Sequence, residues 1–154
     1  MKADQIMTPE PRVATPDTPV RVLAQLMVEH DCGLIPIVAH LEDLQPIGAV
    51  SDRDITCRIV ATGKNPAEHT AADCMTSPCV TVYRDDSVDE CCRVMEDSQV
   101  RRLLVLNRAG QLCGIIAQAD VAEFLRTRQA AEVVREISQR SGAPSNVAPP
   151  PATG

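Results

Sequence analysis

Apolar side chains recur at helical spacing in two stretches of the chain, and the second stretch repeats the first with a shift of 68 positions. The repeated positions are Val20, Leu23, Ala24 and Met27 in the first stretch and Val88, Cys91, Cys92 and Met95 in the second. Spacings of three and four residues place such side chains on one face of an α-helix. The pattern therefore predicts two equivalent amphipathic helices. It also explains the adjacent Cys91 and Cys92 as helix-face packing rather than as a vicinal thiol site.

Each predicted helix is followed by two short apolar runs with a turn between them. The runs cover residues 34–38 and 46–50 in the first copy and residues 103–106 and 112–116 in the second. Such runs are typical of buried strands, and a short turn between neighbouring strands predicts a β-hairpin. A second helix then closes each copy, from Asp52 to about Thr62 and from Gln118 to about Thr127. Each copy is thus expected to have the order β-α-β-β-α.

One copy, with a small sheet and about 60 residues, would be marginally stable alone. We therefore expect one α/β (α+β) fold in which two β-α-β-β-α repeats pack sheet to sheet with pseudo-two-fold symmetry. The predicted repeats span residues 4–63 and 71–127. An amphipathic stripe predicts a C-terminal helix over residues 128–140, packed on the module or on a second subunit. The Gly, Pro, Ser and Ala of residues 141–154 predict a disordered tail.

Charge and composition disfavour several classes of partner. The chain has 15 Lys and Arg against 21 Asp and Glu, a formal net charge of −6, which disfavours binding to nucleic acid. Tyr83 and Phe124 are the only aromatic residues, so a bound base must lie between aliphatic side chains. No apolar run approaches the roughly 18–20 residues that span a bilayer, and the N-terminus has no secretory h-region. We therefore expect no membrane partner and a cytoplasmic location.

The seven cysteines do not have the spacing of a metal or redox site. They are Cys32, Cys57, Cys74, Cys79, Cys91, Cys92 and Cys113, and no two of them form a C-x-x-C pair. We expect most of them to pack as small core hydrophobes, and we expect no bound metal. A thiol or metal sensor is the alternative, and mass spectrometry of the native protein would reveal its disulfide or its metal.

Residues 48–54 end the second strand of the first copy and begin a helix. Ser51 and Asp54 stand three positions apart there, and an ordinary helix cap is one interpretation of this spacing. The other interpretation is a ligand site. Free N–H groups and a hydroxyl at a helix start can hold a phosphate, and a carboxylate in the first turn can bind two ribose hydroxyls. The pattern of this segment alone leaves both open.

Two such copies in tandem resemble a pair of CBS domains, also called a Bateman module. The resemblance covers about residues 4–127 and rests on the ordered repetition of short motifs. They are Met7-Thr8 and Met75-Thr76 at the openings, the pattern Gly-h-h-(Ser/Thr)-x-x-Asp (h, apolar) at residues 48–54, and the strand at residues 100–105. That strand has Leu104 where the family usually has proline, whereas the first copy keeps Pro36.

The resemblance implies a cleft between the copies that binds adenine nucleotides. Carried over position by position, its first site combines Ser51, Asp54, Val80, Val100, Arg101 and Arg102. Asp54 would hold the ribose, Ser51 and the two arginines would face phosphate, and the two valines would flank the base. Arg53 could add charge, although a solvated helix arginine is the plainer interpretation of it. For Arg101 and Arg102, a surface or dimer-interface pair is the alternative.

A second, related site is expected to be weaker. At residues 114–120 the pattern keeps Asp120 but has Ala117 in place of the hydroxyl. The facing strand of the first copy offers Cys32, Gly33 and Leu34, without an arginine. Asp120 could still hold a ribose, but phosphate would be poorly bound. We expect one competent site, or one strong and one weak.

The sequence has no catalytic signature: no nucleophile paired with a base, no nucleophile elbow and no glycine-rich phosphate loop. The expected function is that of a stand-alone, non-enzymatic regulatory module. It would bind AMP, ADP, ATP or a related ligand such as NAD or S-adenosylmethionine, and it would signal through its shape or assembly. The resemblance also implies a homodimer through the repeat helices, acting on an unidentified effector protein. The alternative is an interaction scaffold whose nucleotide sites are vestigial.

Overall fold

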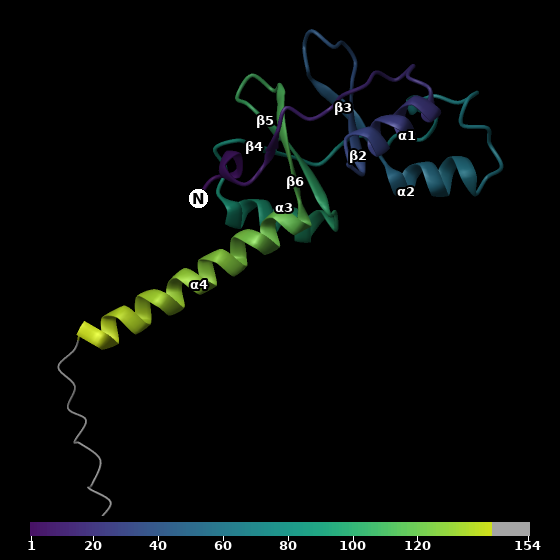
Figure 1. Cartoon of the computed structure of the whole chain (residues 1–154). Coiled ribbons are helices and arrows are strands. Elements are labelled where there is room, and N and C mark those ends of the chain that lie inside the picture. Colours follow the sequence, from purple (N-terminus) through teal and green to yellow (C-terminus); the bar gives the residue numbers. More distant parts are fainter. Residues whose placement is uncertain (143–154) are drawn as a thin grey trace, which may run out of the picture. The chain divides into compact units, whose positions relative to one another are not determined.

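The apolar runs form the two predicted hairpins in the computed structural model, which describes residues 1–142 (Figure 1). In the first repeat, β2 (Leu34–Val38) pairs antiparallel with β3 (Pro46–Ser51). In the second repeat, β5 (Arg102–Leu106) pairs antiparallel with β6 (Leu112–Ala117). The equivalent segments of the two copies thus take the same structure.

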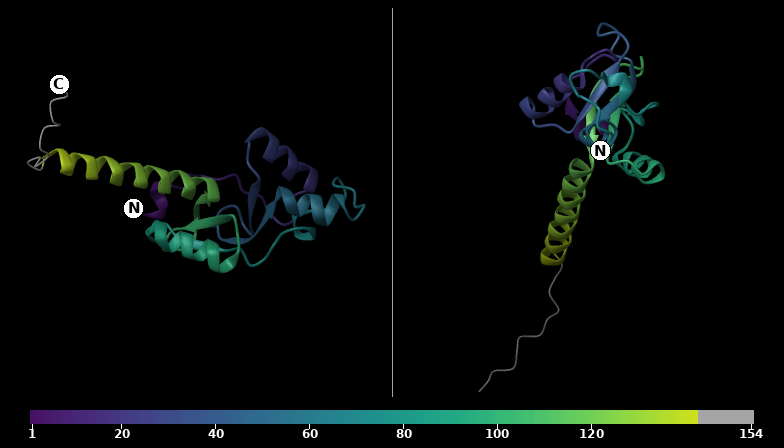
Figure 2. Two further views of the ribbon diagram at one scale, coloured as in Figure 1. Left: turned by 90° about the horizontal axis from the view of Figure 1, so that it is seen from below. Right: turned by 90° about the vertical axis from the view of Figure 1, so that its right-hand side faces the viewer.

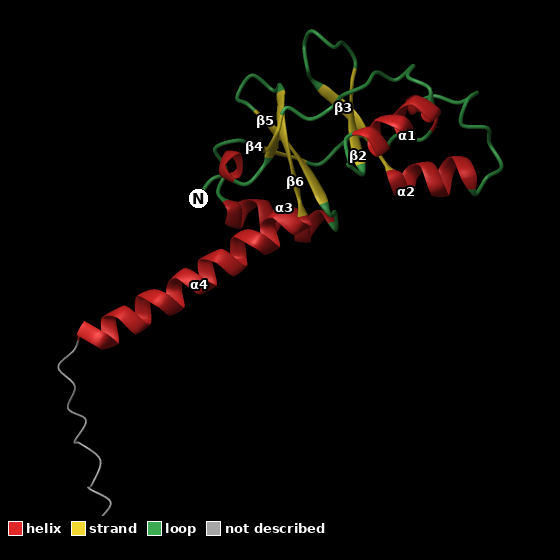
Figure 3. Ribbon diagram, viewed as in Figure 1, coloured by secondary structure: helices red, strands yellow, loops and turns green. Residues whose placement is uncertain are grey.

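The helices follow the apolar pattern of the sequence. The buried residues are Val20, Leu23 and Met27 in α1 (Val20–Glu29) and Val88, Cys91 and Met95 in α3 (Val88–Ser98). The helix that closes the first repeat begins as α2 (Asp52–Ile55) and continues in a π-helical turn, η2 (Thr56–Val60), ahead of Gly63. Figure 3 shows α2 and this turn as one helix that leads directly out of β3.

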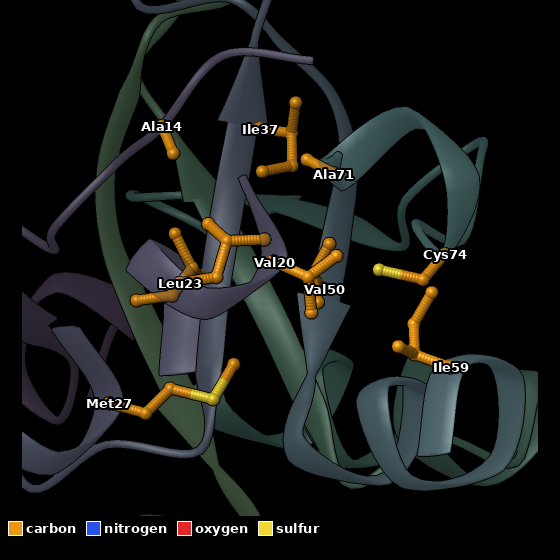
Figure 4. Close-up of a cluster of buried hydrophobic side chains, with 10 residues drawn as sticks. Ala14, Val20, Leu23, Met27, Ile37, Val50, Ile59, Ala71 and Cys74 are labelled. Carbon is orange, nitrogen blue, oxygen red and sulfur yellow. The ribbon is translucent and has the colours of Figure 1, made fainter. Parts of the chain in front are cut away.

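Each hairpin packs against the helices of its repeat through aliphatic side chains. The core of the first repeat includes Leu23, Ile35, Ile37, Val50 and Ile59, and Figure 4 shows how this cluster fills the space between α1, the hairpin and the π-helical turn. The core of the second repeat includes Val82, Cys91, Leu103, Val105 and Ile116. Burial of one such aliphatic side chain contributes about 1.5–3 kcal/mol, so each of these two clusters stabilises the fold substantially.

The short segments that open the two repeats are exchanged between them. β1 (Thr8–Pro9) opens the first repeat but pairs with β6 of the second, with Thr8 opposite Ile115. Thr76 opens the second repeat but pairs with Ala49 in β3 of the first. The sequence pattern assigned each Met-Thr pair to the copy that it opens and did not predict this exchange.

The two cores contain the same exchange. Ala3 and Met7 pack into the core of the second repeat, and Ala71 and Met75 pack into the core of the first. Equivalent hydrogen bonds hold the two segments, from Ala3 N–H to Asp86 O and from Ala71 N–H to Thr18 O, both 2.8 Å long. The repeats are therefore related by the predicted pseudo-two-fold symmetry.

Two glycines make room for the exchanged segments. A Cβ atom on Gly48 would lie 2.8 Å from the carbonyl oxygen of Thr76, and one on Gly114 would lie 3.0 Å from that of Thr8. A carbonyl oxygen that is part of a paired backbone cannot turn aside as the end of a flexible side chain can. In each repeat, the hairpin glycine thus contacts the Met-Thr pair that opens the other repeat, which explains why the sequence repeats both.

The outer strands are more complete in the second repeat than in the first. The second repeat has a four-stranded sheet in the order β1-β6-β5-β4, with β4 (Thr81–Tyr83) parallel to β5. In the first repeat the corresponding pairings are single bridges, from Ala14 to Ile37 and from Ala49 to Thr76. The predicted α/β fold of two β-α-β-β-α repeats is confirmed, with the first strand of the first repeat reduced to one bridge.

The last helix, α4 (Gln118–Gly142), is continuous, and both views of Figure 2 show it unbroken. The sequence predicts a helix that ends near Thr127 and a separate one over residues 128–140, and the structure corrects this division. No Gly or Pro stands within residues 118–141, so nothing in the backbone ends the helix between them. Of the tail predicted over residues 141–154, the first two residues are helical, and residues 143–154 lie outside the described residues.

The chain divides into two compact units. Met1–Val121 contains both hairpins and their cores, and the described part of the second unit is α4 from Ala122 onward. Within this part of α4, Arg126 pairs with Glu123 at 2.8 Å. No helix among the described residues combines the length and the apolar character that crossing a bilayer requires.

Candidate ligand-binding site between the repeats

A cavity of about 640 Å³ lies between the two repeats, a volume within the range of small-molecule sites. The first repeat contributes the end of β3 and the start of α2, and the second contributes residues 76–80 and the start of β5. All the residues predicted for the first site line this cavity: Ser51, Arg53, Asp54, Val80, Val100, Arg101 and Arg102. The structure thus brings the carboxylate of the first repeat and the arginines of the second to one place.

Ser51 and Asp54 form a capping box at the start of α2. The Asp54 N–H donates to Ser51 Oγ at 3.1 Å, and the Ser51 N–H donates to Asp54 Oδ2 at 2.8 Å. The N–H groups between them are also occupied, because that of Asp52 donates to Gly33 O and that of Arg53 to Asp52 Oδ1. The protein itself therefore satisfies the N–H groups at this helix start, so the interpretation in which free N–H groups hold a phosphate does not apply here.

The second carboxylate oxygen of Asp54 faces other groups. The Asp54 side chain is only 16% exposed. Its Oδ1 accepts a long hydrogen bond of 3.5 Å from Thr76 Oγ1 and lies 3.9 Å from Arg58 Nε. Both distances exceed those of strong, charge-assisted hydrogen bonds, so Oδ1 keeps acceptor capacity for a ligand. Thr76 also lines the cavity, although the sequence identifies it only as part of the Met-Thr motif.

Three guanidinium groups at the cavity have no partner among the described residues. The side chains of Arg53, Arg101 and Arg102 make no hydrogen bond or ion pair with any part of residues 1–142. Asp52 and Asp54 are the other charged side chains of the lining, which therefore carries one more positive than negative charge. The cavity is thus locally cationic in a chain whose formal net charge is −6.

Gly33 leaves space that one of these arginines uses. A Cβ atom on Gly33 would lie 2.6 Å from Arg102 Nη2 and 2.9 Å from Asp52 Oδ2. Gly33 in the first repeat corresponds to Arg101 in the second, 68 positions later. The same strand position therefore has a cationic side chain in one repeat and no side chain in the other, and the Arg102 guanidinium and the Asp52 carboxylate lie in the space that Gly33 leaves.

The rest of the wall is largely apolar. Leu34, Val80, Val100 and Leu104 line the cavity, and no aromatic ring does. A planar base would therefore contact aliphatic surface. Cys79 also belongs to this wall, and burial raises the pKa of its thiol above the ordinary value. The thiol is protonated and uncharged at neutral pH.

Asp120, predicted for the second site, lies outside this arrangement. Its Oδ2 accepts a hydrogen bond from the Ala117 N–H at 2.8 Å, which is half of a capping box. Ala117 has no hydroxyl to complete the box. Asp120 is not among the residues that line the 640 Å³ cavity, and within residues 1–142 its carboxylate makes no hydrogen bond or ion pair with Arg53, Arg101 or Arg102.

Most of the cysteines contribute to packing. Five of the seven lie in or against a core: Cys32, Cys74, Cys91, Cys92 and Cys113. Burial raises the pKa of the Cys91 thiol to about 11, so this thiol is unreactive at neutral pH. Cys57, by contrast, is exposed. Within residues 1–142, no three His, Cys, Asp or Glu side chains gather in a way that could hold a metal ion.

Comparison with known proteins identifies the repeats. The model of the CBS domain matches residues 3–61 and 71–127. Hypoxic response protein 1 of Mycobacterium tuberculosis is 35% identical over 114 residues, which are 74% of this chain and 78% of that protein. The uncharacterized protein MK0525 of Methanopyrus kandleri is 37% identical over 101 residues, which are 66% of this chain and only 50% of that protein's length.

Solved structures have the same fold. Hypoxic Response Protein I, crystallised with two coordinated zinc ions, has a TM-score of 0.70 at 32% identity, over 80% of this chain and 98% of that chain. CBSX2 in complex with AMP has a TM-score of 0.70 at 23% identity, over 83% and 98% of the two chains. The CBS domain pair of MJ0100, in complex with 5′-methylthioadenosine and S-adenosyl-L-methionine, has a TM-score of 0.73 at 19% identity, over 83% and 98%. The last two likenesses concern the fold alone. With both repeats matched and the tandem fold in place, the chain belongs to the CBS domain family and contains a pair of CBS domains.

Proposed function

We propose that this chain is a regulatory CBS-pair protein that binds an adenine nucleotide in the 640 Å³ cavity. The observation that carries the proposal is the chemistry of the lining. Three guanidinium groups without partners among the described residues and the second oxygen of Asp54 share a cavity with aliphatic side chains. An adenine nucleotide has a counterpart for each: an anionic phosphate, a ribose diol and a planar base. The complexes of CBSX2 with AMP and of MJ0100 with adenosyl compounds support an adenosine ligand for this fold.

Each side chain has a distinct role in this proposal. Asp54 Oδ1 accepts hydrogen bonds from the ribose hydroxyls, while its Oδ2 stays in the capping box. Arg101 and Arg102 bind phosphate oxygens, with Arg53 as a third charge and the Ser51 hydroxyl as a further donor. The two valines flank the base. A hydrogen bond between charged groups contributes roughly 1.5–3 kcal/mol, so the arginines supply a large part of the affinity.

The charge of the lining favours some adenosine ligands over others. The excess of positive charge attracts AMP, ADP and ATP, and also NAD through its pyrophosphate. S-adenosylmethionine carries a sulfonium cation next to its ribose and would meet repulsion from the arginines. At Asp120, which has no arginine opposite, a ligand would be held through its ribose and only weakly.

Isothermal titration calorimetry with AMP, ADP, ATP, NAD and S-adenosylmethionine tests the proposal. We expect the phosphate-bearing ligands to bind and Arg102→Met to weaken them by roughly tenfold, in line with the loss of one charged hydrogen bond. The matched control is Arg93→Met, because Arg93 is an exposed arginine of α3 that pairs with Glu90 and Asp97. If none of the five ligands binds or raises the melting temperature at millimolar concentration, the scaffold with vestigial sites is the better interpretation.

We further propose that the chain performs no reaction of its own and reports ligand binding to an effector protein through its shape or assembly. A homodimer through the repeat helices is part of this proposal. It is supported by apolar side chains that those helices leave in solvent: Val28 of α1 is 83% exposed and Val60 of η2 is 61% exposed. Seven cysteines without a disulfide support a reducing, cytoplasmic location.

A further inference from the structure

Arg58 connects the candidate site to the exchanged segment without lining the cavity. It stands in the π-helical turn η2, four residues after Asp54. Its Nη1 donates to the carbonyl oxygens of Cys74 and Met75, both at 3.0 Å, and its Nε lies 3.9 Å from Asp54 Oδ1. One guanidinium thus joins a carboxylate of the first repeat to backbone that belongs to the second.

The oxygen of Asp54 that is available to a ligand has few other neighbours. Oδ2 is held by the Ser51 N–H, and within residues 1–142 Oδ1 accepts the 3.5 Å hydrogen bond from Thr76 Oγ1 and lies beside the arginine. Thr76 follows directly after the two carbonyl groups that Arg58 binds. Both neighbours of Oδ1 are therefore fixed to the same exchanged segment. Thr76 belongs to this segment, and Arg58 is hydrogen-bonded to its carbonyl groups at Cys74 and Met75.

We propose that Arg58 is a positioning residue: it orients Asp54 Oδ1 toward the ribose of the bound nucleotide and couples this orientation to the exchanged segment. The inference rests on the proposed function, because it requires a ribose at Asp54. Arg58 is not among the residues that line the cavity, so it acts through Asp54 and not by touching the ligand.

The second repeat has no equivalent arrangement. Asp120 corresponds to Asp54, and the residue that corresponds to Arg58 is Phe124. A phenyl ring has no N–H group to donate to a backbone carbonyl or to a carboxylate. Of the two motif carboxylates, Asp54 and Asp120, Asp54 lines the cavity, and Asp54 is the one with an arginine four positions later.

A purely structural role for Arg58 makes a different prediction. If the residue only ties η2 to residues 74–75, its loss would affect every ligand of the cavity alike. A positioning role concerns the ribose hydroxyls, which are the groups that Asp54 binds. Two ligands that differ only in these hydroxyls therefore separate the two roles.

The test measures binding of ATP and of 2′,3′-dideoxy-ATP to the full chain by isothermal titration calorimetry. Arg58→Met keeps most of the length of the side chain and removes its charge and its donors. We expect it to weaken ATP binding about tenfold and dideoxy-ATP binding less than twofold, as follows from impaired hydrogen bonds to a charged group. Arg93→Met, the control on α3, should leave both affinities unchanged.

Equal losses for the two nucleotides in Arg58→Met, or no loss for either, would overturn the inference and leave the proposed function standing. A wild-type chain that binds neither of these two nucleotides would overturn the inference, and one that also fails to bind AMP, ADP, NAD and S-adenosylmethionine would overturn the proposed function with it. Circular dichroism shows whether the variant is folded. If Arg58→Met does not fold, Arg58→Gln carries the same expectation and the same refutation, because it keeps N–H donors for the backbone carbonyls and lacks the charge.

Discussion

At the scale of single residues, Asp54 serves the fold and the candidate site together. One of its oxygens closes the capping box with Ser51, and the other lies beside Thr76 and Arg58. A helix cap and a ligand site were alternative interpretations of this segment. The geometry makes them compatible, because the two oxygens of one carboxylate can have different partners.

The sequence could predict only part of this environment. A spacing of three residues at a helix start is local, so Ser51 and Asp54 could be identified from the pattern. Thr76 lies 22 positions from Asp54 and reaches it only through the exchange of segments. Arg58 has the sequence context of any helix arginine, since the backbone carbonyls that it binds have no sequence signature.

Asp54→Ala removes both roles of this residue. We expect nucleotide binding to become undetectable by calorimetry and the free energy of unfolding to fall by about 0.5–2 kcal/mol, the usual cost of a lost cap. Asp120→Ala breaks a similar cap contact with Ala117 but should leave most of the nucleotide binding. A larger binding loss in Asp120→Ala than in Asp54→Ala would mean that the two sites have been assigned in reverse.

At the scale of elements, the hairpins and the amphipathic helices could be predicted because their periodicity is local. The exchange of the opening segments could not. Both repeats carry the same Met-Thr pair and the same glycine in the hairpin, so the pattern fits pairing within a repeat and pairing between repeats equally well. Only the path of the chain in three dimensions distinguishes the two. The continuity of α4 had a signal in the sequence, which is the absence of Gly and Pro from residues 118–141.

Gly48→Ala tests the contact that receives the exchanged segment. A Cβ atom 2.8 Å from the Thr76 carbonyl oxygen would force this segment away from β3. We expect the free energy of unfolding, measured by urea denaturation, to fall by about 1–3 kcal/mol, as for overpacked interiors in general. Gly114→Ala is the symmetry-related variant and should show a comparable loss. Wild-type stability of both variants would contradict the role assigned to the two glycines.

At the scale of the whole molecule, the two repeats share a backbone plan but differ in their chemistry. The repeats share their hairpins and their exchanged segments. Yet only the motif of the first repeat lines the cationic cavity with a carboxylate, Asp54, and a hydroxyl, Ser51, and Arg58 lies beside that carboxylate. The difference between the copies is visible in the sequence, because Ala117 and Gly33 stand where Ser51 and Arg101 stand in the other copy, and the expectation of one strong and one weak site stays a prediction. It could not predict the extent of the cavity, which depends on how side chains from both repeats pack.

Light scattering tests the proposed homodimer, for which we expect twice the chain mass of 16.6 kDa. Val28→Asp should shift the protein toward the monomer, because a charge buried in an apolar interface is costly, while the exposed position in α1 leaves the fold intact. The matched control is Leu41→Asp, at an exposed position between β2 and β3. Dissociation by Val133→Asp, in the C-terminal part of α4, and not by Val28→Asp would place the interface on that part of α4 instead of on α1.

The reciprocal placement of the Met-Thr segments bears on how such a chain can originate. A single ancestral unit, alone in solution, would have an unpaired strand edge at its hairpin glycine and an opening segment without a strand to pair with. Two copies of that unit could pair with each other's strand edges, so the minimal stable form would be a pair of identical molecules. Joining the two genes end to end would then preserve every contact of the pair, while each half became free to change its own side chains.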